Sequence, residues 1–304
     1  MSTLSYLYSQ LFGLEKVTLL RSYYELCKPN VVYMMLICAF VGMLLAEESV
    51  SSFGYLFVSL TGIACCAASA AAVNQVIDRN TDASMTRTDQ RPLPQGELSP
   101  THASLFALII GILGALILYL YVNTLTMILT LASLVGYAFI YTVYLKRATP
   151  QNIVIGGLAG AAPPLLGWSS ISNSIDPHAL LLVLIIFVWT PPHFWALAIY
   201  RKDEYAKESI PMLPVTHGVT FTKLQIVLYT IILFIVSMLP YVVLMSGEIY
   251  LFSALILSTI FLYYSINLYF SNDEEDAMKT FQFSIYYIFL IFLALLIDHF
   301  VISS

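Results

Sequence analysis

Residues 74–94 read Asn-Gln-Val-Ile-Asp-Arg-Asn-Thr-Asp-Ala-Ser-Met-Thr-Arg-Thr-Asp-Gln-Arg-Pro-Leu-Pro, and they follow directly on a long apolar segment. Within them Asn74, Asp78 and Asp82 recur at every fourth position. On a helix such positions drift by only about 40° per step, so their side chains form one stripe of oxygen atoms. The apolar stretch before them is long enough to span a bilayer. The sequence therefore predicts a membrane helix with carboxylates at its mouth.

The composition of the whole chain is that of a polytopic membrane protein. The chain has 304 residues, of which 59% are hydrophobic and only 10% charged, and its mean hydropathy is +0.83. A soluble domain carries roughly 25% charged residues. Nine segments are candidate membrane spans, with edges good to a few residues: about 30–46, 53–73, 102–122, 125–144, 152–170, 179–200, 223–245, 249–270 and 281–302.

The basic residues define an orientation. With nine spans, all 13 Lys and Arg residues fall on one side of the membrane. The positive-inside rule then places the N-terminus in the cytoplasm and the C-terminus on the outer side. We expect residues 1–28 to form a cytoplasmic N-terminal segment and residues 29–304 to form a single transmembrane domain.

Two long polar loops, at about 74–101 and 201–222, follow the second and the sixth predicted spans. This offset of four spans suggests two four-helix halves related by duplication, plus one extra helix. Binding sites at such repeat interfaces are common in membrane bundles. We therefore expect an all-α fold of nine transmembrane helices around a central cavity, with both polar loops facing that cavity.

Small residues crowd two of the spans. The second ends Ala64-Cys65-Cys66-Ala67-Ala68-Ser69-Ala70-Ala71-Ala72, and the fifth contains Gly156-Gly157-Leu158-Ala159-Gly160-Ala161-Ala162-Pro163-Pro164. Such runs let helix backbones approach closely in lipid. The Pro163-Pro164 pair is expected to bend or break the fifth span.

The first polar loop carries residues suited to a metal-bound diphosphate. Mg²⁺ takes few protein carboxylates and fills its shell with phosphate oxygens and water, so Asn74, Asp78 and Asp82 are candidate ligands. Arg87 and Arg91 lie in the same loop and could hold phosphate. A helix end whose polar residues meet water would explain single acids but not the stripe beside arginines. The pattern favours chemistry on a lipid diphosphate.

Two further clusters lie at the same side of the membrane. In the second loop Asp203 could take a second Mg²⁺ and Lys207 could meet a phosphate, although an exposed i,i+4 ion pair worth about 0.3 kcal/mol is the alternative. Lys146 and Arg147 follow the fourth span. They either set topology and contact lipid headgroups or turn inward to neutralise a leaving diphosphate.

The sixth span contains Thr190-Pro191-Pro192-His193-Phe194-Trp195. An ionisable residue such as His193 at that depth is a functional candidate by default, and histidine is a usual axial ligand of haem iron. A hydrogen bond between helices is the alternative. The two prolines are expected to open the helix and free backbone carbonyls. His217, after the second loop motif, either lines the site or serves local structure.

These motifs resemble those of the UbiA-type intramembrane aromatic prenyltransferases. The Asn-x-x-x-Asp-x-x-x-Asp pattern after the second span is similar to the first motif of that family. The extended pattern looks like that of its protohaem IX farnesyltransferase (haem O synthase) subfamily. The matching segments are Lys28-Pro29, Asn74 to Gly96, Tyr141-Thr142 to Asn152, Thr190 to Trp195, and Tyr200-Arg201 through Ile210-Pro211-Met212-Leu213-Pro214. Many members of the wider family carry a second Asp-x-x-x-Asp motif. Here Lys207 occupies the last position of that motif, so a symmetric two-metal site is not implied.

The resemblance implies a Mg²⁺-dependent prenyltransferase that moves a farnesyl group from farnesyl diphosphate to a vinyl group of haem B. Addition of water would then give haem O. The implied metal ligands are Asn74, Asp78, Asp82 and Asp203. The basic residues implied to stabilise the leaving charge are Arg87, Arg91, Lys146 and Arg147, with Lys207 as a further candidate. The implied porphyrin contacts are His193, Trp195 and His217.

The same resemblance implies a location and a set of partners. The location is the bacterial cytoplasmic (inner) membrane. The partners are membrane lipids and the two substrates, with a downstream haem-modifying enzyme or an oxidase assembly factor as a further candidate and no nucleic acid.

Two other interpretations stay open. A UbiA-type enzyme could prenylate a quinone precursor or a chlorophyll-type alcohol, because the first motif does not distinguish acceptors; the Pro-Pro-His-Phe-Trp segment favours haem. The chain could also be a secondary transporter with repeated halves. Transporters usually place their ionisable residues near the midplane. Here those residues cluster at the cytoplasmic rim, which suits a water-soluble diphosphate head and a buried tail.

Overall fold

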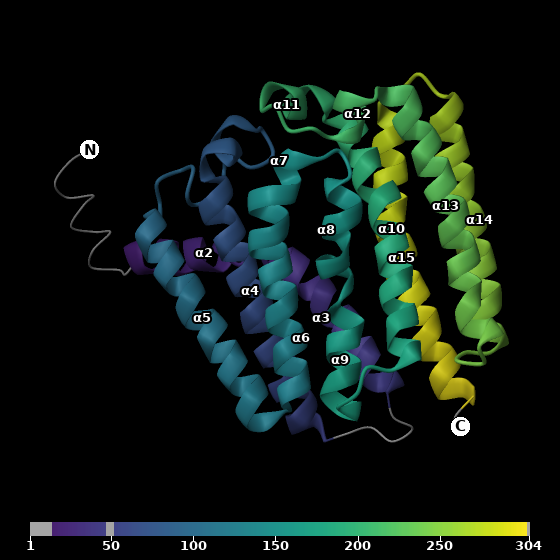
Figure 1. Cartoon of the computed structure of the whole chain (residues 1–304), viewed down its shortest axis with the longest axis horizontal. Helices are drawn as coiled ribbons and strands as arrows, with labels where there is room; N and C mark the ends of the chain where they lie inside the picture. The colour runs from purple at the N-terminus through teal and green to yellow at the C-terminus, as the bar shows by residue number, and fades with distance from the viewer. Residues whose placement is uncertain (1–13, 47–51, 303–304) are drawn as a thin grey trace.

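The computed structural model describes residues 14–46 and 52–302, and every regular element in that part of the chain is a helix (Figure 1). Residues 1–13 of the predicted N-terminal segment lie outside the described residues. Besides the π-helix η1 (Gly136–Leu145), the helices are α2 (Leu14–Leu26), α3 (Pro29–Leu45), α4 (Phe53–Ser84), α5 (Pro100–Tyr121), α6 (Thr124–Val135), α7 (Lys146–Ala148), α8 (Asn152–Ala161), α9 (Pro163–Ser172), α10 (Pro177–Tyr200), α11 (Lys202–Lys207), α12 (Leu213–Thr216), α13 (Val219–Val242), α14 (Glu248–Phe270) and α15 (Glu275–Ile302).

The helices agree with the predicted spans. In the described part of the chain, eight are long and apolar enough to cross a membrane, or nine if the bent pair Leu19–Leu26 and Pro29–Leu45, with 49° between its two parts, is one span. One span, Thr124–Ala148, joins α6, η1 and α7, and another, Asn152–Ser172, joins α8 and α9. Many large apolar side chains are exposed around the bundle, as a lipid-facing surface requires. The protein is a polytopic integral membrane protein.

Six segments close an inner ring. α3 packs against α4, α4 against η1, η1 against α8, α8 against α10, α10 against α15, and α15 against α3. The remaining long helices α5, α6, α13 and α14 pack on the outer side of this ring. The sequence predicted a central cavity inside such a ring of helices, and that cavity stays a prediction.

Two glycines allow α3 to touch the span formed by α8 and α9. A Cβ atom added to Gly167 would lie 1.8 Å from the carbonyl oxygen of Ala39, and one added to Gly42 would lie 2.2 Å from that of Pro164. The main chains of the two helices are therefore in direct contact, which small residues permit in lipid. The break between α8 and α9 lies at Pro163, as the sequence predicted.

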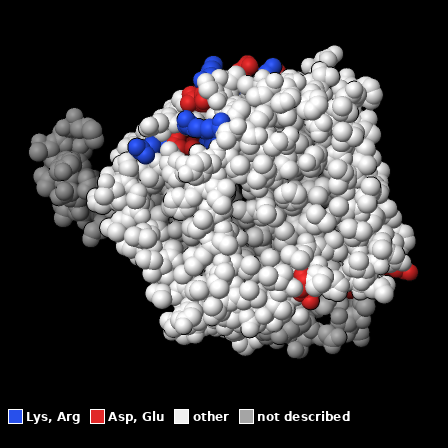
Figure 2. Space-filling view, viewed as in Figure 1, with Lys and Arg blue, Asp and Glu red and all other residues white. Residues whose placement is uncertain are grey.

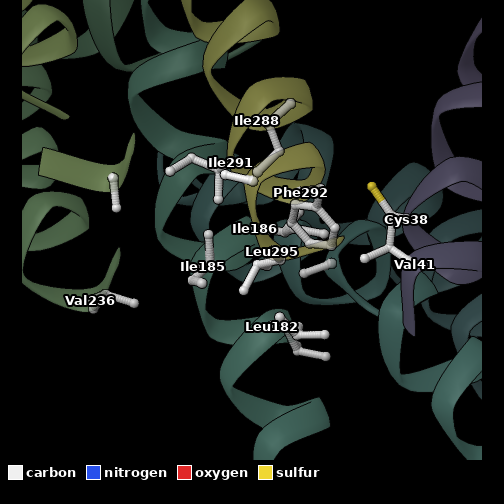
Figure 3. Packing of buried hydrophobic residues seen from close by; sticks show 14 of the residues in the cluster. Cys38, Val41, Leu182, Ile185, Ile186, Val236, Ile288, Ile291, Phe292 and Leu295 are labelled. Carbon is white, nitrogen blue, oxygen red and sulfur yellow. The ribbon is translucent and has the colours of Figure 1, made fainter. Parts of the chain in front are cut away.

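Apolar side chains fill the ring in the half that lies away from the polar loops. Cys38 and Val41 of α3 share one buried cluster with Ile186 of α10 and with Phe292 and Leu295 of α15 (Figure 3). We call these five residues the apolar plug. Phe292 and Leu295 are almost fully buried. The plug packs α3 against α10 and α15 in that half of the ring.

The expectation that Pro191 and Pro192 open the sixth span was wrong, because α10 runs unbroken from Pro177 to Tyr200. Proline has no N–H, so the carbonyls of Phe187 and Val188 lose their usual helical donors. Packing against α8, α9, α13 and α15 keeps this backbone helical, as neighbouring helices commonly do for prolines in membranes.

The two long polar loops meet at one end of the bundle. The connection after α4 lies at the same end as α7, α11 and α12 (Figure 1). Met85, just after α4, belongs to the same buried cluster as Tyr205, Ile210 and Met212 of the second loop. On the face that Figure 2 shows, the Lys and Arg side chains gather only at this end. The prediction that loops remote in sequence converge is thus confirmed.

Candidate active site

The stripe of oxygen-bearing side chains is built by α4, which continues as one helix to Ser84. Asn74, Asp78 and Asp82 therefore share one face of that helix, and each is no more than 5% exposed. Buried carboxylates need cations or donors around them, because an unpaired buried charge is costly. The neighbours of these three residues therefore show what the site is built to bind.

Each of the two carboxylates forms an ion pair. Lys146 Nζ lies 2.7 Å from Asp78 Oδ2, and Arg91 Nη1 lies 2.6 Å from Asp82 Oδ2. Lys146 follows the π-helix η1 and turns inward, which is one of the two interpretations left open for it. The wider turn of a π-helix is often found at functional sites, and here it aims the end of the fourth span at α4.

Asn74 links the stripe to two more helices. Its amide nitrogen donates to Asp78 Oδ2 at 2.9 Å and to the Thr142 hydroxyl at 3.1 Å. Its carbonyl oxygen accepts a hydrogen bond from Lys28 Nζ. Lys28 lies at the bend between α2 and α3 and has a left-handed backbone with φ 50°. This conformation is uncommon for a lysine, and here the bend brings the ammonium group into the site.

Three more groups surround the carboxylates. Arg147 Nη2 donates to the Thr81 hydroxyl at 2.8 Å, one turn from Asp78. Arg87 is exposed but interacts electrostatically with Lys28. The rings of Tyr137 and Tyr141 stack with centroids 5.8 Å apart, and both are close enough to feel the charge of Asp78. The carboxylates thus lie beside an aromatic wall.

The charges of this site do not balance. Four cations (Arg87, Arg91, Lys146 and Arg147) stand against two carboxylates (Asp78 and Asp82), which leaves an excess of two positive charges, and the amino group of Lys28 lies beside them. A partly buried cluster with such an excess has a strong field for an anion, and a narrow site focuses that field. The arrangement is suited to a polyanion such as a diphosphate.

The structure does not bring the second loop's acid to this stripe. Asp203 is exposed and lines a small pocket of about 130 Å³ with Arg201, Glu204 and Glu274. Arg201 Nη1 pairs with Glu204 at 2.6 Å, and Lys207 is exposed. Among the described residues, no three His, Cys, Asp or Glu side chains gather closely enough to hold a metal ion.

The three residues predicted to contact a porphyrin lie apart. His193 is buried between α10 and α15, with Nδ1 2.6 Å from the Ser284 hydroxyl. Trp195 is 1% exposed, and its ring meets that of Tyr229 on α13 edge-on at 5.2 Å, on the outer side of the ring of helices. His217 is exposed and hydrogen-bonded to its neighbour Thr216.

Some site residues were not identified from the sequence. Lys28 was noted only as part of a resemblance, although a basic residue directly before a proline at a span entrance is a readable signal. Thr81 and Thr142 likewise lay within segments quoted for the resemblance, but no site role was predicted for them, and the contact of Thr142 depends on the π-helical register of η1. Periodicity rules assume the α-helical turn and miss this register.

The comparison with known protein families matches residues 35–296 to the UbiA prenyltransferase family. The chain belongs to this family. It is similar to "Protoheme IX farnesyltransferase 2" of Pseudoalteromonas atlantica, with 58% identity over 280 residues that cover 92% of each chain. It is also 57% identical to "Protoheme IX farnesyltransferase" of Legionella pneumophila (strain Corby), over 92% of this chain and 95% of that one.

Several solved structures share the fold. A digeranylgeranylglyceryl phosphate synthase superposes with a TM-score of 0.77 at 20% identity, over 93% of this chain and 99% of that one. A UbiA homologue from Archaeoglobus fulgidus, bound to DMAPP and Mg²⁺, superposes with a TM-score of 0.62 at 17% identity, over 90% of this chain and 99% of that one. At these identities the likeness concerns the fold.

The donor set of this UbiA site fits a magnesium ion that is shared with a phosphate. In both Asp78 and Asp82 the ion pairs use Oδ2, and the stripe places the two carboxylates one helical turn apart. Mg²⁺ is usually held by one or two carboxylates together with substrate phosphates and water, not by an all-protein cage. Two carboxylates with cations beside them match that requirement.

Proposed function

We propose that this UbiA-family protein transfers the farnesyl group of farnesyl diphosphate to a vinyl group of protohaem IX (haem B), giving haem O. Identity of 57–58% to protohaem IX farnesyltransferases over nearly the whole chain carries the choice of substrates. The excess of two positive charges around a buried acidic stripe supports a diphosphate as donor.

In this proposal the cations exchange partners when the donor binds. Without substrate, Lys146 and Arg91 neutralise Asp78 and Asp82. The phosphate oxygens take over both cations, which leaves the two carboxylates for Mg²⁺. Arginine suits this exchange, because its planar fork matches phosphate as well as carboxylate. Asp203 is exposed and away from the stripe, so the proposal holds the metal with Asp78 and Asp82, and with Asn74 once Lys28 turns to phosphate.

The reaction then needs charge stabilisation and a dry site. The allylic C–O bond breaks, and its electron pair leaves with the diphosphate, where Lys28, Arg91 and Lys146 stabilise the new charge. Mg²⁺, when bound, neutralises more of that charge. The vinyl π electrons of haem B form the new C–C bond with the farnesyl cation. Water captures the resulting carbocation and loses a proton. The apolar side chains of the plug disfavour the entry of bulk water into the site from the far end of the bundle.

We further propose the orientation of the protein. The end with the polar loops faces the cytoplasm, because the Lys and Arg side chains seen in Figure 2 gather there and the positive-inside rule favours that side. In a bacterium the membrane is the cytoplasmic (inner) one. Farnesyl diphosphate then enters with its head at the cytoplasmic rim and its tail in the bilayer.

A direct test uses the full-length protein in lipid nanodiscs with Mg²⁺, farnesyl diphosphate and one acceptor at a time. Mass spectrometry of the product should show haem B enlarged by one farnesyl group and one hydroxyl group. An aromatic quinone precursor should remain unmodified under the same conditions. Prenylation of the quinone precursor with haem B untouched would contradict the proposed acceptor. No product with either would contradict the proposal as a whole.

A further inference from the structure

Ser284 of α15 holds two aromatic residues of the Trp189–Trp195 segment at once. Its hydroxyl oxygen lies 2.6 Å from Nδ1 of His193, and its backbone carbonyl accepts a hydrogen bond from the indole N–H of Trp189 at 2.7 Å. Both partners come from α10, so one residue ties the two inner-ring helices together at the depth of His193. None of the sequence motifs singled out Ser284.

The hydrogen bonds of Ser284 favour one tautomer of His193. The hydroxyl has a single hydrogen, and the carbonyl oxygen of Phe281 lies 2.5 Å away to accept it. With its hydrogen on that carbonyl, the same oxygen accepts from His193, which favours the tautomer with the hydrogen on Nδ1. A neutral imidazole with its proton on Nδ1 has a lone pair on Nε2. That nitrogen is a common metal ligand in proteins.

Packing leaves only one edge of the imidazole for a ligand. The ring of Trp189 stacks on one side with centroids 4.3 Å apart, and the ring of Phe281 stacks at 4.6 Å. Nδ1 faces Ser284. Within the described residues Nε2 has no hydrogen-bonding partner, and it is not among the buried polar atoms that lack one. Nε2 therefore retains access to something outside the protein.

His193 and the acidic stripe lie at similar distances from the ends of their helices. His193 lies seven residues before the end of α10, and Asp78 lies six residues before the end of α4, so each is about 10 Å along its helix from that end. An acceptor held at His193 would thus lie toward the same end of the bundle as the diphosphate site. Both residues belong to inner-ring helices.

A histidine that only tied two helices would not need this arrangement. The pair Thr230 and Ser265 ties α13 to α14 with a hydroxyl contact of 2.9 Å and no ring. His193 instead has both faces covered, one nitrogen fixed and the other unused. Metal-bound histidines characteristically have their second nitrogen fixed by such a partner.

We propose that Ser284 is a positioning residue that fixes His193 as the Nδ1-protonated tautomer and so presents Nε2 as an axial ligand to the iron of the protohaem substrate. This inference rests on the proposed function, since it needs haem as the acceptor. The bond formed is a dative one from the Nε2 lone pair to iron, and no redox change or proton transfer accompanies it. Iron bound in this way holds the porphyrin in one position while its vinyl group reacts.

The test is spectroscopic and uses haem B with the full-length protein in nanodiscs, without farnesyl diphosphate. Resonance Raman spectra of the ferrous complex should contain an iron–histidine stretching band, which His193→Ala abolishes. Ser284→Ala should shift this band, because loss of the acceptor at Nδ1–H makes the imidazole a weaker base. It should also weaken haem binding about 10- to 100-fold, the range for partners of metal ligands. The KM for farnesyl diphosphate should stay unchanged.

Two further variants keep the result unambiguous. Ser265→Ala removes a buried hydroxyl between two other helices and should leave the band and the haem affinity unchanged. Ser284→Cys keeps a similar volume with a weaker acceptor, and it should give a smaller band shift even if Ser284→Ala fails to fold. A wild-type band in the Ser284 variants, or a band that persists in His193→Ala, would overturn the inference.

The results that would refute the proposed function differ from those that would refute axial ligation. Wild-type protein that makes haem O but shows no iron–histidine band would refute axial ligation by His193 and leave the proposed function intact. Wild-type protein that makes no haem O would refute the proposed function itself.

Discussion

The pair of Asp78 with Lys146 defines the site at the level of single residues. Asp78→Asn removes a charge that the proposed metal needs, and it leaves Lys146 without its partner. We expect haem O formation to fall by about 100-fold or more, as for loss of one transition-state charge contact elsewhere. The initial rate in nanodiscs measures this, with circular dichroism as the check that the variant is folded.

Asp203 provides the contrast, because it was predicted from the sequence to be a metal ligand and the structure leaves it exposed. Asp203→Asn should reduce the rate by less than about threefold, as expected for a surface substitution. The same rate assay compares the two variants. A loss in Asp203→Asn as large as that in Asp78→Asn would show that the second loop closes onto the stripe when substrate binds.

Arg91 separates the two substrates. It pairs with Asp82 in the structure and is proposed to turn to the diphosphate. Arg91→Gln should raise the KM for farnesyl diphosphate about tenfold or more, because charge-assisted hydrogen bonds to phosphate are the strong ones. The KM for haem B should change little. Steady-state kinetics with each substrate varied in turn measure both values, and equal rises in the two would contradict the assignment.

At the scale of helices, the contact of α3 with α9 is the tightest. Gly167→Ala places a methyl group 1.8 Å from the carbonyl of Ala39, so the helices must separate. Overpacking of this kind costs about 1–3 kcal/mol. We expect a lower Tm in detergent, measured by circular dichroism or intrinsic fluorescence.

Gly160 is the matched control for that substitution. It lies in α8 of the same broken span, and nothing lies within 4 Å of a Cβ atom added there. Gly160→Ala should leave the Tm unchanged or raise it, because alanine is the better helix former. Equal losses in the two variants would show that the α3–α9 contact does not limit stability.

Asp298 caps a neighbouring helix from a distance. This residue of α15 is fully buried, and its carboxylate accepts the backbone N–H groups of Gly247 and Tyr250, the latter at 3.0 Å, at the start of α14. Asp298→Ala leaves both donors unsatisfied and should cost about 1–3 kcal/mol. Unfolding in detergent measures the loss. Glu275→Ala, which removes an exposed acid from the same helix, should have little effect.

The elements also show what a sequence reveals and what it conceals. The stripe from Asn74 to Asp82 was readable, because four-residue spacing has one meaning on an α-helix. The inward turn of Lys146 was not, because it depends on the π-helical register of the preceding turns. Lys28 enters the site through a left-handed backbone at a bend. Asp203 was predicted to join the stripe because its loop follows the sixth span as the stripe follows the second. The structure leaves it exposed instead.

At the scale of the whole molecule, magnesium should affect activity and not folding. The helices and their ring are held by packing, and the described residues offer no protein cage for a metal. A chelator should abolish haem O formation, and excess Mg²⁺ should restore it. The helical circular dichroism and the Tm without substrate should stay the same. Full turnover in chelator would refute the metal proposal.

The overall architecture followed from the sequence more fully than the site did. Apolar length gave the spans, and all predicted segments coincide with helices or helix pairs of the bundle. The convergence of two polar loops followed from their spacing along the chain. The unbroken α10 did not follow, because its prolines are supported by helices that only the assembled bundle supplies.

The apolar plug lies in the half of the ring away from the polar loops. Its five side chains offer a charged reactant no polar partner, so we expect diphosphate to leave by the polar end at which the donor arrives. Turnover should then be independent of the transmembrane voltage, which acts on charges that cross the membrane.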